Sequence, residues 1–585
     1  MLAPGGVAIV TGLLAHQLVF IHGEWHLKSP RVLVLHLLFG TLLFANQAFG
    51  HESAQASLLK TIYLAACYLL SLFTNITVYR LIFHRLKNFP GPKLAAVTKL
   101  WHVWKCRDSR GHLVLQAWHE KYGEFVRTGP AEITIFHPEA YEAMDGHDNK
   151  NTRSDWYDLL YPRISSIFTR DRQLHNERRK VWEQALSTKG LVDTMVQNIS
   201  KTDSRSALLQ YHRRVVEKVQ ILERLVTLER SRPVLINDLM YFFAFDSMGD
   251  FAFSEDFGMM RNQRWHSSIA MLRSALTLLG PLSPAIWIPR LGFAFIPTVW
   301  KVRHWFHMLE FCDQCMARRM KKTPPDRDIA SWFIEDHAKH ESDPTRAKWL
   351  SGDTATLVVA GRSVRLDIMR QRTDSCSDTT APSLTLLFYF LARYPIHTER
   401  IYEEIREVDR ESPAALATLP HLNGTINEAM RLLPAVLTFS SRVTPPEGLT
   451  IDGTFIPGNT KICAPRYTIG RRENLHILAL VRNTKVLQVE TAYVHPHEFI
   501  PGRWYSQPEL IKDKRAFAPF GVGRTSCVGR HLALAQIRLV SAALVFRHRI
   551  KFAPGEKNGE AVERDMKDQL TAQPGACRLV FESRV

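Results

Sequence analysis

Long apolar stretches occur only in the first 83 residues of this chain, and this limits how the rest can fold. They run over 7–21, 32–49 and 58–83, and the third is the longest. A helix needs roughly 20 apolar residues to cross a bilayer, so the first two are near the lower limit. The sequence after them is of the soluble type, which argues against a transporter or receptor with many spans.

The first stretches predict a membrane anchor, residues 1–84, with one to three transmembrane helices. Arg85 and Lys87 follow the third stretch, and basic residues beside a span favour the cytoplasmic side. Three spans would put Lys28 on that side too, while a single span at the third stretch is the alternative. The Pro-Gly-Pro at 90–92 stops any helix and predicts a stiff joint.

Residues 85–585 are predicted to form one mainly helical body with small β-sheets. Apolar residues recur at three- and four-residue spacing over much of 100–440. The clearest helical segments are 113–122, 176–186, 300–320 and 384–392, and the β-like runs are 125–128, 132–136 and 449–456.

Charge and cysteine usage exclude two classes of protein. The net charge is +18, but Lys and Arg are spread along the chain without a block of five or six, so no nucleic-acid partner is predicted. The eight cysteines are scattered, unlike a disulfide framework. Cys312 and Cys315 form a CxxC without a second ligand pair, and we interpret them as structural thiols in a helix.

One cysteine differs from the others because glycines surround it. Residues 520–529 read Phe-Gly-Val-Gly-Arg-Thr-Ser-Cys-Val-Gly, and helical text follows at 531–545. Glycines permit tight turns, and a helix beginning just after Cys527 directs its positive end at a thiolate. Such a thiolate can bind haem iron axially and favour O–O cleavage. Cys527 is therefore the candidate metal ligand.

This loop resembles the cysteine-ligand loop of the cytochrome P450 family, usually written FxxGxRxCxG. Phe520, Gly523, Cys527 and Gly529 match in register, and Arg524 lies one place before the family's arginine. The resemblance implies the cytochrome P450 fold and haem b (iron protoporphyrin IX) as cofactor. It also implies that Phe520, Arg524 and Gly529 belong to the haem-binding site.

The resemblance further implies a monooxygenase that inserts one oxygen atom from O2 into a small lipophilic organic substrate. The wording of several segments, such as FPGPKLAA and KDKRAFAPFG, is most similar to fungal members that tailor secondary metabolites. Electrons would come from NADPH through the flavoprotein NADPH–cytochrome P450 reductase. The anchor would hold the body in the endoplasmic reticulum membrane, facing the cytosol.

A second motif predicts a structural network. Glu428 and Arg431 are three residues apart in helical text, so their side chains share one face and can pair. Residues 499–504 resemble the family segment whose arginine joins this pair, and Arg503 would be that arginine.

Three basic residues are implied as partners of the haem propionates. Arg442 matches a family position that often reaches a propionate. His175 and Arg179, at i and i+4, lie in a segment that resembles the helix crossing the haem edge. Taken alone, that stretch is equally consistent with a solvated basic face.

The family's oxygen-activation helix is present but interrupted. Residues 357–361 match its first half, and the match resumes at Asp378 and Thr379, the implied catalytic acid and alcohol that relay protons. Between them, 362–376 hold four arginines and two aspartates. Charges of this kind cannot enter an apolar helix centre without a large desolvation cost.

Two further segments, 474–492 and 190–206, interrupt the resemblance in a similar way. We interpret one or more of the three as translated intron sequence. The alternative is genuine surface insertion, which loops tolerate well. An inactive relative, or a defective gene model with a disrupted oxygen-activation helix, is the alternative to a working enzyme.

We predict that the working enzyme lacks 362–376. A chain without this segment should bind haem and oxidise substrate at least as well as the full chain, because its two half-helices then join. Transcripts that all carry the segment would refute the intron interpretation, and loss of haem binding on deletion would make the segment structural.

Overall fold

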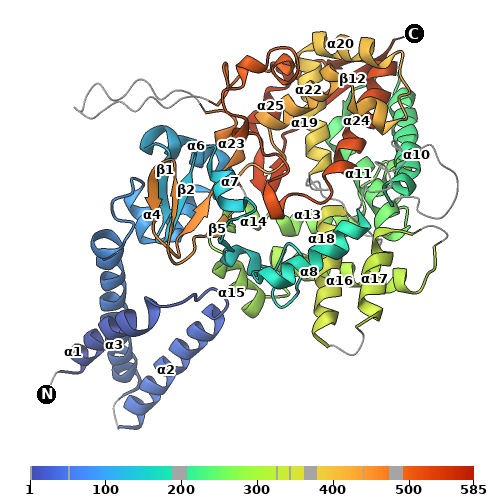
Figure 1. Cartoon of the computed structure of the whole chain (residues 1–585). Coiled ribbons are helices and arrows are strands. Elements are labelled where there is room, and N and C mark those ends of the chain that lie inside the picture. Colours follow the sequence, from blue (N-terminus) through green and yellow to red (C-terminus); the bar gives the residue numbers. More distant parts are fainter. Residues whose placement is uncertain are drawn as a thin grey trace, which may run out of the picture.

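Helices dominate the body (Figure 1), and one of them, α11 (Ile236–Phe253), is almost entirely buried. Its sequence is apolar on all sides, as expected for a helix inside a core. It packs against α10 (Ala207–Leu228), α18 (Pro344–Gly361) and α19 (Thr380–Arg393).

The computed structural model describes residues 3–50, 53–186, 207–324, 327–340, 344–361, 379–438, 441–472 and 492–584.

The other helices complete the body, and the predicted helical segments are confirmed. Cys312 and Cys315 are fully buried, as expected of structural thiols. The longer helices are α6 (Gly111–Tyr122), α8 (Arg172–Ala185), α13 (Ser267–Leu276), α15 (Trp287–Phe295), α16 (Trp300–Met320), α17 (Ile329–Ala338), α20 (Pro395–Ile405), α22 (Pro420–Leu432) and α24 (Arg530–Arg547). The short ones are α4 (Lys93–Val97), α5 (Lys99–Lys105), α7 (Ala140–Asp145), η3 (Asp155–Asp158), α12 (Met259–Asn262), α14 (Leu279–Leu282), α21 (Pro413–Ala417), α23 (Arg466–Ile469), η5 (Pro501–Trp504), η6 (Pro508–Leu510), η7 (Lys514–Ala516), η8 (Gly523–Thr525), η9 (Lys557–Gly559) and α25 (Glu560–Arg564).

Short strands form a small mixed sheet with the order β1-β2-β8-β5-β3, in which only the β2–β8 pair is parallel. Its strands are β1 (Phe125–Gly129), β2 (Glu132–Ile135), β3 (Thr152–Arg153), β5 (Ser441–Val443) and β8 (Lys461–Cys463). The remaining strands are β4 (Val234–Leu235), β9 (His548–Phe552) and β12 (Arg578–Ser583), which form one sheet, and the pair β10 (Lys567–Gln569) and β11 (Thr571–Gln573).

The predicted single run over 449–456 is a hairpin instead, made of β6 (Leu449–Ile451) and β7 (Thr454–Ile456). Asp452 and Gly453 at its tip have φ values of 46° and 67°. Two consecutive left-handed residues form the turn that best matches the twist of a two-stranded hairpin.

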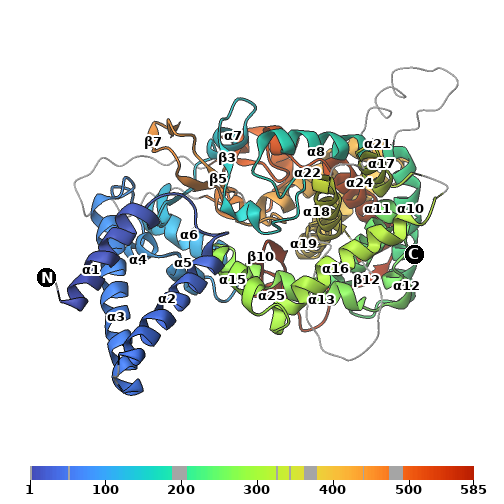
Figure 2. The same cartoon turned by 90° about the horizontal axis from the view of Figure 1, so that it is seen from below.

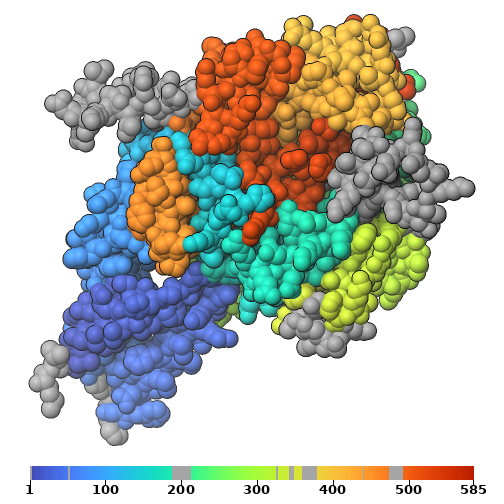
Figure 3. Space-filling view, viewed as in Figure 1, coloured from blue at the N-terminus to red at the C-terminus, as the bar shows by residue number. Residues whose placement is uncertain are grey.

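The N-terminal helices form a bundle of their own beside the body (Figures 2 and 3). It consists of α1 (Pro4–Leu14) with its continuation η1 (Ala15–Phe20), α2 (Ser29–Phe49), and α3 (Ala54–Val78) with its continuation η2 (Tyr79–Phe83). By length and composition, α2 and the continuous helix Ala54–Phe83 could cross a membrane, while Pro4–Phe20 is shorter. Side chains of α2 are largely exposed, which suits contact with lipid.

Segments 190–206 and 362–376 lie outside the described residues, as do Asp378 and 474–491. Of the predicted insert 474–492, only Ala492 is described.

A buried carboxylate ties α22 to the chain that precedes the cysteine loop. Glu428 Oε1 accepts from Arg431 Nη2 at 2.8 Å and from Arg503 Nε at 2.9 Å, and all three side chains are fully buried. Trp504 Nε1 donates to Glu428 Oε2 at 2.9 Å. The predicted network is therefore formed, although Gly502 occupies the place of the family's usual glutamate.

We predict that Glu428→Gln lowers the free energy of unfolding by about 3–5 kcal/mol, the usual cost of breaking a buried ion pair. The matched control is Glu403→Gln, which removes an exposed partner of Arg406 and should cost at most about 1 kcal/mol. Urea unfolding of the detergent-solubilised chain measures both changes. Equal losses in the two variants would contradict the role assigned to the network.

Candidate functional site

A cavity of about 380 Å³ lies between α8, α18, α19, α24 and the cysteine loop, residues 520–529. Most residues predicted for the site line it, namely His175, Arg179, Thr379, Arg442, Phe520, Cys527 and Gly529. Sequence reasoning missed several others, among them Arg153, Tyr157 and Thr525. Among the described residues, Arg524 is exposed and outside this lining, so its predicted contact with the cofactor gains no support.

The cysteine loop is held by its own backbone. Cys527 N donates to Phe520 O at 2.8 Å, and Ser526 N donates to Gly523 O at 3.2 Å. Gly523 has a φ of 57°, and a Cβ there would lie 1.9 Å from the carbonyl oxygen of Asp145. Only glycine allows the loop to pack this closely against the end of α7.

The Cys527 side chain is accessible from the cavity, although protein surrounds the loop. Burial raises the pKa of its thiol, while the backbone N–H of Gly529 and the charges of Arg179 and Arg530 act to lower it. A bound cation deprotonates a coordinating thiol outright. The α24 helix begins at Arg530, so its positive end also favours a thiolate here.

Arginines gather at one edge of the cavity. Arg153 and Arg442 stand directly opposite each other across the β3–β5 pair. Repulsion between two like charges in this arrangement destabilises the pairing of the strands. Arg442 Nε donates to Asp145 Oδ1 at 2.7 Å, and its Nη1 donates to the Tyr157 hydroxyl at 2.6 Å. Burial lowers the pKa of Arg153 to about 10, which leaves it cationic at neutral pH.

The α8 helix adds two residues to this edge. Arg179 Nη1 donates to Ser526 O at 2.9 Å and so contacts the loop next to Cys527. Burial, followed by the charge of Arg153, lowers the pKa of His175 to about 4, so its imidazole is neutral at pH 7. Both predicted residues therefore line the cavity, and their binding of haem propionates stays a prediction.

A buried ion pair fixes α8 against α18. Arg178 Nε donates to Asp353 Oδ2 at 2.8 Å, and Trp182 Nε1 donates to Asp353 Oδ1 at 2.8 Å. Asp353 is fully buried. This contact sets the position of the helix that carries His175 and Arg179.

Both described parts of the interrupted helix reach the cavity. Thr356 and Leu357 of α18 line it, as do Thr379 and Thr380 at the start of α19. Thr379 is exposed on this wall. The acid predicted beside it, Asp378, lies outside the described residues.

The donor set of the cavity fits haem. Among the described lining residues are one cysteine thiol, four arginines and a single aspartate. The arginine-rich edge suits a ligand with carboxylates, since guanidinium groups bind them through charge-assisted hydrogen bonds. The walls near Cys527 are largely apolar, with Met430, Val436, Leu532 and Ile537 among them. Such walls suit the ring of a porphyrin.

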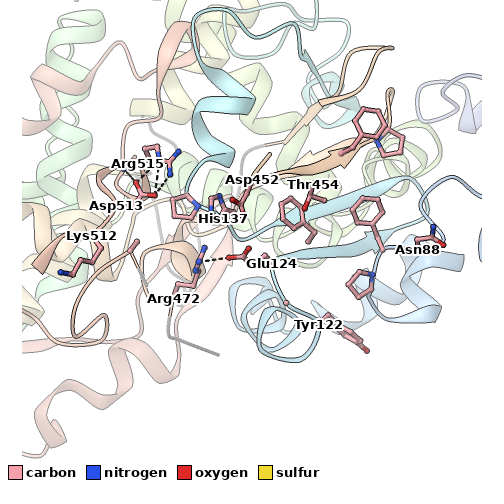
Figure 4. Close-up of a pocket in the computed structure, with 18 of the residues that line it drawn as sticks. Asn88, Tyr122, Glu124, His137, Asp452, Thr454, Arg472, Lys512, Asp513 and Arg515 are labelled. Atoms are coloured by element: carbon pink, nitrogen blue, oxygen red, sulfur yellow. Dashed lines mark hydrogen bonds and ion pairs between the residues drawn. The ribbon is translucent and has the colours of Figure 1, made fainter. Parts of the chain in front are cut away.

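A larger hollow of about 1230 Å³ lies beside β1 and the β6–β7 hairpin (Figure 4). Glu124, His137 and Asp452 lie close enough there to hold a metal ion. Arg472 already pairs with Glu124 at 2.8 Å, which argues against a metal site at these three residues. Arg472, which precedes the predicted insert 474–492, and Ala492, its last residue, both line the hollow.

Comparison with known proteins gives one family. The family model described as Cytochrome P450 matches residues 90–476 and 478–576. The chain is 32% identical to a tryprostatin B 6-hydroxylase of Neosartorya fischeri over 93% of this chain and 92% of that protein. It is also 32% identical to the cytochrome P450 monooxygenase notG' of Aspergillus versicolor, over 95% and 93% of the two chains. The cytochrome P450 monooxygenase sthD of Phaeosphaeria nodorum is 34% identical, over 84% of this chain and 94% of that protein.

Proposed function

Since this chain belongs to the cytochrome P450 family, we propose that it hydroxylates a small lipophilic compound in a pathway of secondary metabolism. It is a cytochrome P450 monooxygenase, and the family implies a haem-thiolate centre. One relative is named as a 6-hydroxylase of tryprostatin B, which supports hydroxylation as the reaction.

The observation that carries the site assignment is the access of Cys527 to a cavity with an arginine-rich edge. In our proposal Cys527 ligates the iron, and Arg442, Arg179 and His175 bind the two propionates. Burial and the charge of Arg153 lower the pKa of His175 to about 4, and the negative charge of a bound propionate would raise it.

Haem would supply the activation of O2 and the transfer of one oxygen atom. The protein's residues prepare that chemistry. Cys527 as thiolate would donate electron density, and the apolar wall would exclude water from the substrate. The hydroxyl of Thr379, on the cavity wall, would hold a proton donor in place, with Asp378 as the acid that supplies it.

We further propose that residues 1–84 anchor the enzyme in the endoplasmic reticulum membrane. Two helices of suitable length and composition support this. The catalytic domain, 85–585, would then face the cytosol, with 190–206, 362–376 and 474–492 as candidate inserts.

Electrons would arrive from NADPH through an acidic flavoprotein reductase. Five exposed basic residues on or before the cysteine loop and α24 support such a docking face, namely Lys512, Lys514, Arg515, Arg524 and Arg530. Charge complementarity of this kind accelerates association.

An inactive relative is the second candidate, because residues 362–376 interrupt the sequence of the oxygen-activation helix. The spectrum of the reduced enzyme with carbon monoxide separates the two. A thiolate-haem band together with substrate oxidation supports the enzyme, and its absence from well-folded protein supports the inactive relative.

We predict that Cys527→Ala abolishes the thiolate-haem band in that spectrum, because the variant has lost the axial sulfur. The matched control is Cys463→Ala, which removes a thiol of β8 outside the cavity lining and should keep the band. A persistent band in Cys527→Ala would refute the ligand assignment.

We predict that reduction by the reductase slows as ionic strength rises, because salt shortens the Debye length to about 8 Å at physiological strength. Lys514→Gln should lower the rate at low salt, while Lys150→Gln, at an exposed site paired with Glu447, should not. Stopped-flow reduction measures both. A rate that ignores salt would place the docking face elsewhere.

A further inference from the structure

The loop between η1 and α2 contacts the body through four polar residues, here called the polar clasp: Glu24, His26, Asp158 and Arg170. Arg170 Nη2 donates to Glu24 Oε1 at 2.7 Å, and its Nη1 donates to Asp158 Oδ2 at 3.1 Å. His26 Nε2 lies 2.7 Å from the same Asp158 oxygen, and the His26 side chain is only 7% exposed. Two residues from the N-terminal bundle thus meet two from the body.

Both body members of the clasp adjoin the wall of the haem cavity. Arg170 Nε donates to the carbonyl oxygen of Arg153 at 2.9 Å. Asp158 directly follows Tyr157, whose hydroxyl accepts from Arg442 at 2.6 Å. Arg153, Tyr157 and Arg442 all line the cavity. The clasp is therefore one hydrogen bond or one peptide unit away from its arginine-rich edge.

The packing of the bundle brings the clasp loop to the body. Ser71 Oγ donates to Ile9 O at 3.0 Å, and the rings of His16 and Tyr79 lie 5.5 Å apart. The earlier residue of the first helix, Ile9, contacts the earlier residue of the second, and the later residue, His16, contacts the later one. The continuous helix of α1 and η1 therefore runs parallel to α3 and η2. A Cβ at Gly12 would lie 2.0 Å from Ser71 Oγ, so glycine permits this close approach. The loop after η1 consequently emerges at the end where α3 meets the body.

We propose that Glu24 and His26 are positioning residues of the haem site, supplied by the membrane anchor. They hold Arg170 and Asp158, and through these the backbone of Arg153 and the ring of Tyr157. Glu24 is 46% and Arg170 27% exposed at the side chain. Ion pairs this exposed contribute little to overall stability, so losing the clasp shifts the cavity wall without unfolding the body.

This inference rests on the proposed function, because it assigns the wall to haem binding. Its test removes the anchor's half of the clasp and keeps Arg170 and Asp158: Glu24→Arg and His26→Phe, each as full-length protein in membranes. Haem transfer to an acceptor apoprotein should become about tenfold faster in each variant, at the lower end of what loss of a supporting partner costs a metal site. Glu24→Asp, which keeps a carboxylate for Arg170, should retain most of the original rate. The matched control is Glu403→Arg, which reverses an exposed partner of Arg406 on α20 outside the cavity lining and should change nothing.

A cross-link tests the contact without haem. Cysteines at 24 and 170 should join on mild oxidation in intact membranes, while cysteines at 24 and 150 should not. Absence of the first cross-link, unchanged haem transfer in Glu24→Arg and His26→Phe, or a Glu24→Asp variant as fast as Glu24→Arg would each overturn the proposal. A wild type without a thiolate-haem band would overturn the proposed function instead, and the cross-link would still report on the clasp.

Discussion

The path of the chain toward Cys527 depends on how one buried carboxylate is neutralised. Glu428 accepts five hydrogen bonds, from two nitrogens of Arg431, from Arg503, from Trp504 and from the backbone N–H of Ile500. An unpaired charge at this depth would be prohibitively costly, so these donors must stay in place together. Arg431 and Arg503 also donate to backbone carbonyls before and after residues 473–491, which lie outside the described residues. These carbonyls include those of Gly470 and Val494. The carboxylate thus organises the segment that leads into the cysteine loop.

A second buried acid organises the opposite wall. Asp353 binds Arg178 and Trp182 and fixes α8 against α18, and the neighbouring Arg179 then reaches Ser526 beside Cys527. The sulfur and the arginine-rich edge are therefore held by separate polar contacts on different helices. Because the charged groups of both networks are paired in the interior, the walls of the cavity keep their positions.

Local spacing revealed much of this arrangement. The i, i+3 spacing of Glu428 and Arg431 predicts a shared helix face, and the glycines around Cys527 predict the tight loop. Arg153 carried no such signal, because it meets Arg442 only through the register of two strands nearly 300 residues apart in sequence. Arg524 is predicted to contact the cofactor because the family's loop carries an arginine one place later. Thr525 occupies that later position here, and it lines the cavity. Contacts within a helical turn can be read from a sequence, whereas pairing between distant strands cannot.

The parallel packing of α1 on α3 has a consequence for biosynthesis. The helix that leaves the ribosome first pairs with one that follows about 50 residues later, and α2 must turn back between them. The first helix therefore cannot complete its packing until α3 has been synthesised. Domains fold from the N-terminus as synthesis proceeds, so the bundle assembles before residues 158 and 170 are available to the loop at 24–26. The catalytic body then folds against a surface that already exists, and errors in the assembly of the bundle would be carried into the wall of the cavity.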